Sequence, residues 1–129
     1  SRNIYCTNND LNFNGNDMWV NYQKKNEYLP LHHHEGVLSW VLWVKIPYEI
    51  EEERKQNLDD KGESVTACLN FSYFDIAGNQ RSLPVPVDKS QEGVLMMFPS
   101  KLLHQVNPFY KSEGERISIS GNIRYETVV

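Results

Sequence analysis

The sequence predicts an all-β domain with minor helix, arranged as a β-barrel or a β-sandwich. Three observations indicate this fold class. Five or more short runs rich in β-branched and aromatic residues follow one another, turn signals of Gly, Asn and Pro separate them, and there is no convincing long helical pattern. Because the chain has 129 residues, we expect residues 1–129 to form a single domain.

The first half of the chain is expected to hold three strands. Residues 1–17 are rich in Asn and Asp, which favour turns. A tight turn is expected at Lys24-Lys25-Asn26, because Asn tolerates the left-handed backbone conformation. Residues 37–46 have the sequence VLSWVLWVKI, which is the clearest strand signal, and Pro47 ends it. The expected strands are 18–23, 28–34 and 37–46.

The second half is expected to hold an acidic connection and four further strands. Residues 48–63 carry runs of Glu and Asp, which predict a solvated loop or a short helix with no role in the core. Pro84 and Pro86 place their strand at a sheet edge, whereas GVLMMF before Pro99 is expected to be a buried strand. The expected strands are 64–75, 81–87, 93–98 and 115–122, with a turn at 77–79.

Composition indicates an ordinary soluble domain, with 40% hydrophobic and 23% charged residues. The net charge of −4 does not favour nucleic acid as a partner. The longest apolar run is too short to span a membrane, so no membrane partner is expected. Cys6 and Cys68 make no disulfide framework. One bridge between them is an option, but two free thiols in a reducing cytoplasm are the expected state.

All four histidines belong to one pattern, namely His32-His33-His34 and His104. Imidazole is the commonest protein ligand for transition metals. Alternate residues of a strand share a face, so His32 projects with His34, and His33 projects with Glu35. Either pair could provide two ligands of a three-point iron site, with His104 as the third. The alternative is a polar exposed run together with a core histidine whose hydrogen bonds are satisfied.

The last expected strand alternates between polar and apolar residues. Its polar face is expected to look towards water or into a barrel lumen, and its apolar face towards the core or a covering layer. A buried Arg116 two residues from Ser118 would be a ready carboxylate holder, although a surface ion pair of Arg116 with Glu113 or Glu115 is the alternative. The polar face holds Arg116, Ser118, Ser120 and Asn122, and the apolar face holds Ile117, Ile119 and Ile123.

These segments resemble the double-stranded β-helix of the 2-oxoglutarate- and Fe(II)-dependent oxygenases, and within them the small phage and bacterial oxygenases with an H-x-H motif. His32-x-His34 stands where the superfamily has an H-x-D/E pair, His104 where it has a distal histidine, and Arg116-x-Ser118 where it has R-x-S. Asn21-Tyr22 resembles the N-x-Y approach to the metal motif in the alkylated-DNA-repair branch. The strands LSWVLWVKIP, GVLMMFPSKLLHQV and ERISISGN resemble those of the H-x-H group, so the resemblance covers about residues 19–123.

The resemblance implies a jelly-roll or cupin-like barrel and a site with two parts. Fe(II) would be held by His32, His34 and His104. The far carboxylate of 2-oxoglutarate would be held by Arg116 and Ser118. Asn70 and Tyr73 lie on opposite faces of their strand, so at most one can add a contact; Asn70 is assigned to this role, and Tyr73 is expected to pack. Trp40 and Trp43 are expected in the core.

His34 departs from the family pattern, in which Asp or Glu is usual, because a carboxylate would lower the net charge of the iron. Three-histidine iron sites occur in cupin-type dioxygenases. The second register, His33 with Glu35, would restore a carboxylate, but the spacing from Asn21 favours His32 with His34.

The resemblance implies a hydroxylase-type oxygenase, which couples oxidative decarboxylation of 2-oxoglutarate by O2 to oxidation of an unknown substrate. Two other classes stay open on the sequence alone. One is a cupin-like metal dioxygenase that does not use 2-oxoglutarate, and the other is a non-catalytic β-barrel such as a phage interaction module. The expected location is the cytoplasm, that of the host if the chain is phage-encoded.

Overall fold

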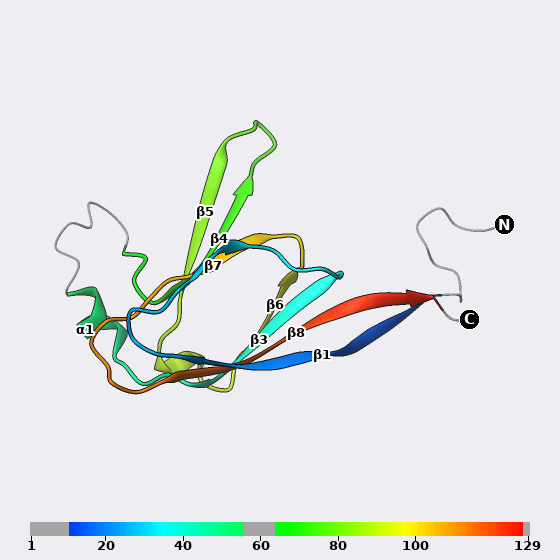
Figure 1. The fold of residues 1–129 in the computed structure, drawn as a ribbon. Coiled ribbons are helices and arrows are strands. Elements are labelled where there is room, and N and C mark those ends of the chain that lie inside the picture. The colour runs from blue at the N-terminus through cyan, green and yellow to red at the C-terminus, as the bar shows by residue number, and fades with distance from the viewer. Residues whose placement is uncertain (1–10, 56–63, 128–129) are drawn as a thin grey trace.

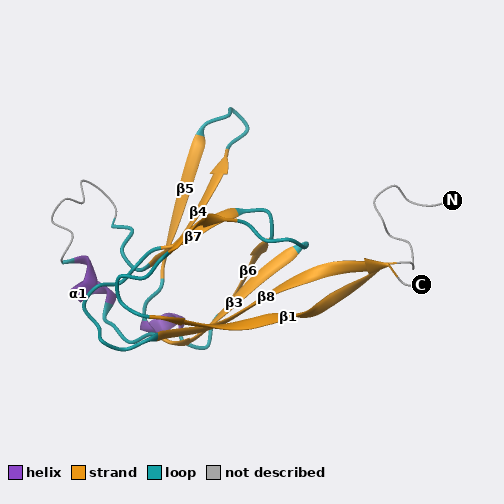
Figure 2. Ribbon diagram, in the orientation of Figure 1, coloured by secondary structure: helices purple, strands orange, loops and turns teal. Residues whose placement is uncertain are grey.

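The computed structural model describes residues 11–55 and 64–127, and strands dominate these residues (Figures 1 and 2). An α-helix, α1 (Ile50–Arg54), and a 3-10 turn, η1 (Lys89–Gln91), are the helices of the described part, and neither could cross a membrane. The expected all-β class with minor helix is confirmed. The strands are β1 (Leu11–Gln23), β2 (Leu29–His32), β3 (Leu38–Lys45), β4 (Cys68–Phe74), β5 (Gln80–Pro86), β6 (Leu95–Pro99), β7 (Leu103–Val106) and β8 (Arg116–Thr127).

The strands form two four-stranded antiparallel sheets, with the orders β1-β8-β3-β6 and β2-β7-β4-β5. Figure 1 shows the two sheets diverging from the end near α1 towards the free ends of β1 and β8 and of the β4–β5 hairpin. Strands far apart in the sequence are neighbours: β1 pairs with β8, and β2 pairs with β7. The second pairing sets His32 opposite His104, seventy-two residues later in the chain.

Most expected strands are confirmed, and the differences concern the sheet edges. β3 lies where the sequence predicted it, Asn26 adopts a left-handed φ of 67°, and β5 is an edge strand. β6 is an edge strand too, which corrects our prediction of a buried strand, since Phe98 is its one buried residue. Its alternate side chains, Leu95 and Met97, lie on the outer face of the sheet and are exposed. β7 had no strand prediction, although it carries His104.

The N-terminal turn prediction is also corrected. β1 begins at Leu11, and the residues Asn14-Gly15-Asn16-Asp17 lie within it at an irregularity of register with β8. A bulge of this kind takes up turn-forming residues without ending the strand. Residues 1–10, with Cys6, lie outside the described residues, and Cys68 is buried, with its Sγ donating to the Thr66 carbonyl over 3.5 Å.

The polar face of β8 is buried, whereas its apolar face is not covered by the described residues, contrary to our expectation that the apolar face would meet the core or a covering layer. Arg116, Ser118 and Asn122 are buried on the inner face, as a polar lumen requires. The isoleucines lie on the outer face and are half-buried. On the same outer face Met18 of β1 and Met97 of β6 are 59% and 51% exposed, so this apolar face is open over the described residues.

The two tryptophans of β3 point to opposite sides. Trp43 is buried in the core, as expected, whereas Trp40 lies on the outer face against Gly121 of β8, which corrects its core assignment. The apolar core between the sheets is built from Val41, Trp43, Ile46, Tyr48, Ile50, Ala67, Leu69, Phe71, Val87, Phe98 and Phe109.

The acidic connection holds a short helix, α1, which is one of its two predicted forms, but it contributes to the core, contrary to the prediction. Glu53 of α1 is 1% exposed, and its carboxylate accepts hydrogen bonds from the backbone N–H groups of Tyr110 (2.7 Å) and Lys111 (3.0 Å). Hydrogen bonds to an ionised group contribute about 1.5–3 kcal/mol. Glu53 therefore ties α1 to the segment before β8. Residues 56–63 of this connection lie outside the described residues.

Replacing Gly121 by Ala is expected to destabilise the protein by about 1–3 kcal/mol. An added Cβ would lie 2.6 Å from ring atoms of Trp40, so the indole would have to move. Urea unfolding measures this change. Gly15→Ala in β1 is the control, because its Cβ would meet nothing within 4 Å. In a Trp40→Leu background the cost of Gly121→Ala should shrink; an unchanged cost would refute the steric explanation.

Candidate metal centre

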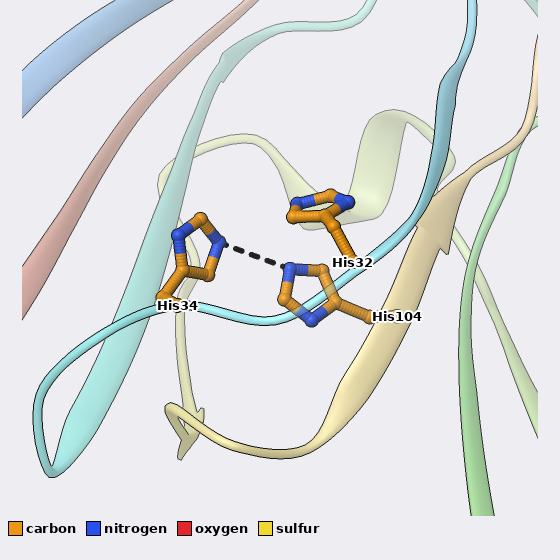
Figure 3. A group of neighbouring side chains, drawn as sticks. All are labelled: His32, His34 and His104. Atoms are coloured by element: carbon orange, nitrogen blue, oxygen red, sulfur yellow. Dashed lines mark hydrogen bonds between the residues drawn. The ribbon is translucent and has the colours of Figure 1, made fainter.

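Three histidine side chains converge at the open end of the two sheets. His32 ends β2, His34 follows in the loop before β3, and His104 lies on β7. Their candidate ligand nitrogens all lie within 4.8 Å of one another. Figure 3 shows the three rings facing a common point, with the Nε2 atoms of His34 and His104 3.1 Å apart. This spacing suits three ligands of one transition-metal ion.

Hydrogen bonds fix the tautomers of two of the rings. The Nδ1 atom of His32 lies 2.6 Å from the carbonyl oxygen of Pro30, and the Nδ1 atom of His104 lies 2.8 Å from that of Leu102. A carbonyl oxygen can only accept, so each Nδ1 donates a proton and each Nε2 carries a lone pair, which on His104 accepts a hydrogen bond from the Nε2 of His34 in the ligand-free protein. A histidine held in this way presents Nε2 to a metal.

The backbone also holds the loop that carries the third ring. The N–H of His34 donates to the carbonyl of Ser100 over 2.8 Å, and the hydroxyl of Ser100 accepts from Ser39 of β3 over 2.9 Å. Ser39 and Ser100 are both buried. The position of His34 therefore depends on a buried polar contact between β3 and the segment after β6.

Burial keeps two of the imidazoles neutral. It lowers the pKa of His104 to about 4, and the neighbouring His32 and His34 add to this effect. Burial is also the main cause of a lowered pKa for His34, and the charge of His32 lowers this pKa further. Because a metal binds the neutral ring, this environment prepares the cluster for a cation near pH 7.

The alternative ligand pair lies on the other side of the loop. His33 and Glu35 are both exposed. The Glu35 carboxylate accepts a hydrogen bond from the Lys101 ammonium over 3.1 Å, which lowers its pKa. Among the described residues the metal-competent cluster contains no carboxylate. The end of β2 and the loop after it therefore bring His32 and His34 together with His104, and leave Glu35 outside.

A buried guanidinium marks the other part of the site. Arg116 of β8 is 2% exposed, and its NH groups donate to three neutral oxygens. The acceptors are the Tyr48 hydroxyl (2.8 Å), the Ala67 carbonyl (3.2 Å) and the Gln23 side-chain oxygen (2.6 Å). Over the described ranges 11–55 and 64–127 no carboxylate lies within salt-bridge distance of it. A buried ion without a counterion costs several kcal/mol, so this site attracts an anion.

Aromatic rings and small polar groups surround the guanidinium. Its central carbon lies 5.3 Å from the centroid of the Trp43 ring, a favourable cation–π distance. The Trp43 Nε1–H is buried and has no acceptor among the described residues, which costs about 1–3 kcal/mol. Ser118 is buried two residues further along β8 and accepts from the Asn21 amide over 3.2 Å.

Asn70 is the one assigned site residue that the structure does not bring to the cavity. Phe71 lies on the face of β4 that contacts His104, and Asn70 lies on the opposite face, where it is half-buried. The side-chain oxygen of Asn70 accepts a hydrogen bond from the Ser82 hydroxyl over 2.8 Å. Tyr73 shares the strand face of Phe71 but is exposed. Conversely, Gln23 and Tyr48 contact Arg116 without having been predicted. The register that pairs Gln23 with Arg116 is set by the β1–β8 ladder, which the sequence did not reveal.

One cavity joins the two parts of the site. Its volume is about 540 Å³, and His32, His34 and His104 line it together with Arg116 and Ser118. Apolar walls and few polar groups are typical of small-molecule sites. Aromatic side chains of β1 and of the turn after it, including Trp19 and Tyr28, are exposed at the lining.

A family model described as "Putative 2OG-Fe(II) oxygenase" matches residues 17–122. The chain belongs to this family. The residues matched to the oxygenase family include the three clustered histidines, Arg116 and Ser118. A search of the curated proteins finds no match. The family implies Fe(II) and 2-oxoglutarate, and the chemistry of the described side chains fits both: three imidazoles whose ligand nitrogens lie within 4.8 Å of one another suit the metal, and a buried arginine without an acid among the described residues suits a carboxylate.

The metal-free protein should lose stability between pH 7 and pH 5. The pKa of His104 is about 4 in the folded state against 6.5 for an ordinary histidine, so the unfolded chain binds the extra proton in this interval. The stabilisation is complete above about pH 6.5 and falls as the pH drops, by about 1–2 kcal/mol at pH 5. Urea unfolding with a chelator measures it. His104→Gln should remove most of this pH dependence; His33→Gln, at an exposed site, should retain it.

His34→Ala should abolish tight metal binding, whereas Glu35→Gln should leave it unchanged. Loss of a residue that only supports a ligand weakens metal affinity by roughly 10–100-fold, and loss of a ligand should exceed this. Anaerobic titration with Fe(II), and with Zn(II) as a redox-inert control, gives the affinities. The opposite pattern, with Glu35→Gln weakening binding and His34→Ala tolerated, would mean that the other register holds the metal.

Proposed function

We propose that this protein is an Fe(II)- and 2-oxoglutarate-dependent oxygenase of the hydroxylase type, built on a double-stranded β-helix. The observation that carries the proposal is the buried Arg116, which has no carboxylate partner in the described part of the chain and lines the same cavity as the three-histidine cluster. A cation site and an anion site in one cavity fit a ligand that has a metal-chelating end and a separate carboxylate. 2-Oxoglutarate has both.

The sheet order supports the double-stranded β-helix. Two facing antiparallel sheets of four strands, with the orders β1-β8-β3-β6 and β2-β7-β4-β5, have the strand number and layering of a jelly roll. In this arrangement the first and last described strands are neighbours, so Asn21 and Gln23 of β1 lie beside Ser118 and Arg116 of β8.

His32, His34 and His104 would hold the iron, and Arg116 with Ser118 would hold the far carboxylate of 2-oxoglutarate. When bound, the iron and 2-oxoglutarate supply the oxidising power, using O2 and releasing succinate and CO2. The protein supplies position. The Tyr48 hydroxyl donates to the Val87 carbonyl over 2.7 Å and accepts from Arg116, so it fixes the guanidinium within the core.

The absence of a carboxylate from the histidine cluster has an electrostatic consequence. Three neutral imidazoles leave the charge of a divalent ion uncompensated, whereas the usual Asp or Glu would reduce it by one. An anionic 2-oxo acid would then bring the first negative charges to the metal. We therefore expect binding of metal and of 2-oxoglutarate to strengthen each other.

A metal dioxygenase that does not use 2-oxoglutarate is less consistent with Arg116, because such an enzyme has no need for a buried carboxylate holder. If that alternative held, Arg116→Ala would leave metal-dependent O2 uptake intact. A non-catalytic barrel would show neither O2 uptake nor turnover of 2-oxoglutarate.

The direct test is an anaerobic titration of the Fe(II)-loaded protein with 2-oxoglutarate, followed by visible absorption. The proposal expects the weak charge-transfer band of a metal-bound 2-oxo acid, and succinate formation once air is admitted. Absence of both the band and succinate, in protein shown to contain iron, would overturn it.

Gln23→Glu should weaken 2-oxoglutarate binding by at least about tenfold while leaving Fe(II) affinity nearly unchanged. The new carboxylate would stand 2.6 Å from the Arg116 guanidinium and form an internal ion pair, which would compete with the cosubstrate. The same anaerobic titration measures the change. Gln80→Glu on the edge strand β5 adds the same charge at an exposed position and serves as the control. Equal affinities of the two variants would contradict the assignment of Arg116.

A further inference from the structure

The indole N–H of Trp43 is a hydrogen-bond donor without an acceptor. Among the described residues only two buried side-chain nitrogen or oxygen atoms lack a partner, and they are the Nε1 of Trp43 and the Nε of Arg54. Buried polar groups in folded proteins are nearly always paired. Trp19 follows that rule, since its Nε1 donates to the Asn21 side-chain oxygen over 3.1 Å.

Trp43, which carries this unpaired donor, lies in the wall of the candidate site. Trp43 is 2% exposed, lies on the inner face of β3 and lines the cavity. Its register partner on β8 is Ser118, and the Arg116 guanidinium lies over its ring. Over residues 11–55 and 64–127, a buried donor without an acceptor and a buried cation without an anion therefore belong to the same stretch of cavity wall.

Packing explains the ring of Trp43 but not its N–H. The aromatic face contacts the guanidinium and fills the core, and a phenyl ring could do both. The N–H adds only a desolvated donor to the ligand-free protein. A carboxylate offers about four lone-pair positions, so Arg116 and Ser118 together leave room on it for another donor.

We propose that the Trp43 Nε1–H donates a hydrogen bond to the far carboxylate of the cosubstrate and thereby selects dicarboxylate over monocarboxylate 2-oxo acids. This inference rests on the proposed function. The Trp43 N–H of β3 would act together with the donors of Arg116 and Ser118 on β8, so that two neighbouring strands of one sheet bind the carboxylate. The unpaired N–H of the ligand-free protein is then a preformed part of the binding site.

The test compares Trp43→Phe with the wild-type protein, each loaded with Fe(II) under anaerobic conditions. The dissociation constants of 2-oxoglutarate and of 2-oxobutyrate, which lacks the far carboxylate, are measured by calorimetry. Trp43→Phe should weaken 2-oxoglutarate about 5–50-fold, as loss of a charge-assisted hydrogen bond does, and leave 2-oxobutyrate within about twofold. The urea midpoint of the ligand-free variant should not fall. Phe74→Leu, at an exposed position of β4 outside the cavity lining, should match the wild type for both ligands.

A second measurement needs only the wild-type chain. The protein has three tryptophans, and the indole ¹H–¹⁵N signal of Trp43, assigned with Trp43→Phe, should shift downfield when the Zn(II)-loaded protein is saturated with 2-oxoglutarate but not with 2-oxobutyrate. An unmoved signal, equal weakening of both ligands, or unchanged 2-oxoglutarate affinity in Trp43→Phe would overturn the inference. If the wild type binds no 2-oxoglutarate at all, the proposed function itself fails, which is a distinct result.

Discussion

The buried charge of Arg116 is the constraint on which the rest of this structure depends. The guanidinium is almost inaccessible to water, and over the described residues only neutral oxygens contact it. Tyr48, Gln23 and the Ala67 carbonyl satisfy its hydrogen bonds without cancelling its charge. The inner face of β8 is polar for this reason, and its isoleucines lie outside. A protein that keeps a cation in this state needs an anion from elsewhere.

The sheet topology links this cation to the histidine cluster. β8 lies between β1 and β3, and β7 pairs with β2, so one cavity is lined by residues from both ends of the chain. Backbone carbonyls orient His32 and His104, and a buried contact between β3 and the segment after β6 holds the loop of His34. The three imidazoles and the Arg116 guanidinium therefore line the same cavity.

The sequence was sufficient for the parts of the site that follow local rules. Alternation predicted that His34 and Glu35 would point to different sides, and the family resemblance predicted that the histidines and Arg116 would share one site; the structure places them around one cavity. Long-range register was not accessible: the contact of Gln23 with Arg116 depends on the β1–β8 ladder. Burial was misjudged where charge alone guided the prediction, as at Glu53, whose two backbone donors make its burial favourable. Asn70 was misplaced because alternation gives two faces and does not say which one meets the cavity.

The central claim is that one cavity binds a metal through three histidines and a carboxylate through Arg116. A crystal structure of the protein with metal and 2-oxoglutarate tests it most directly, with anomalous scattering to locate the ion. The account predicts the ion within bonding distance of the Nε2 atoms of His32, His34 and His104, and the far carboxylate of the cosubstrate on Arg116, beside Ser118. An ion bound elsewhere, or an Arg116 that keeps only its neutral partners while 2-oxoglutarate is bound at another place, would contradict it.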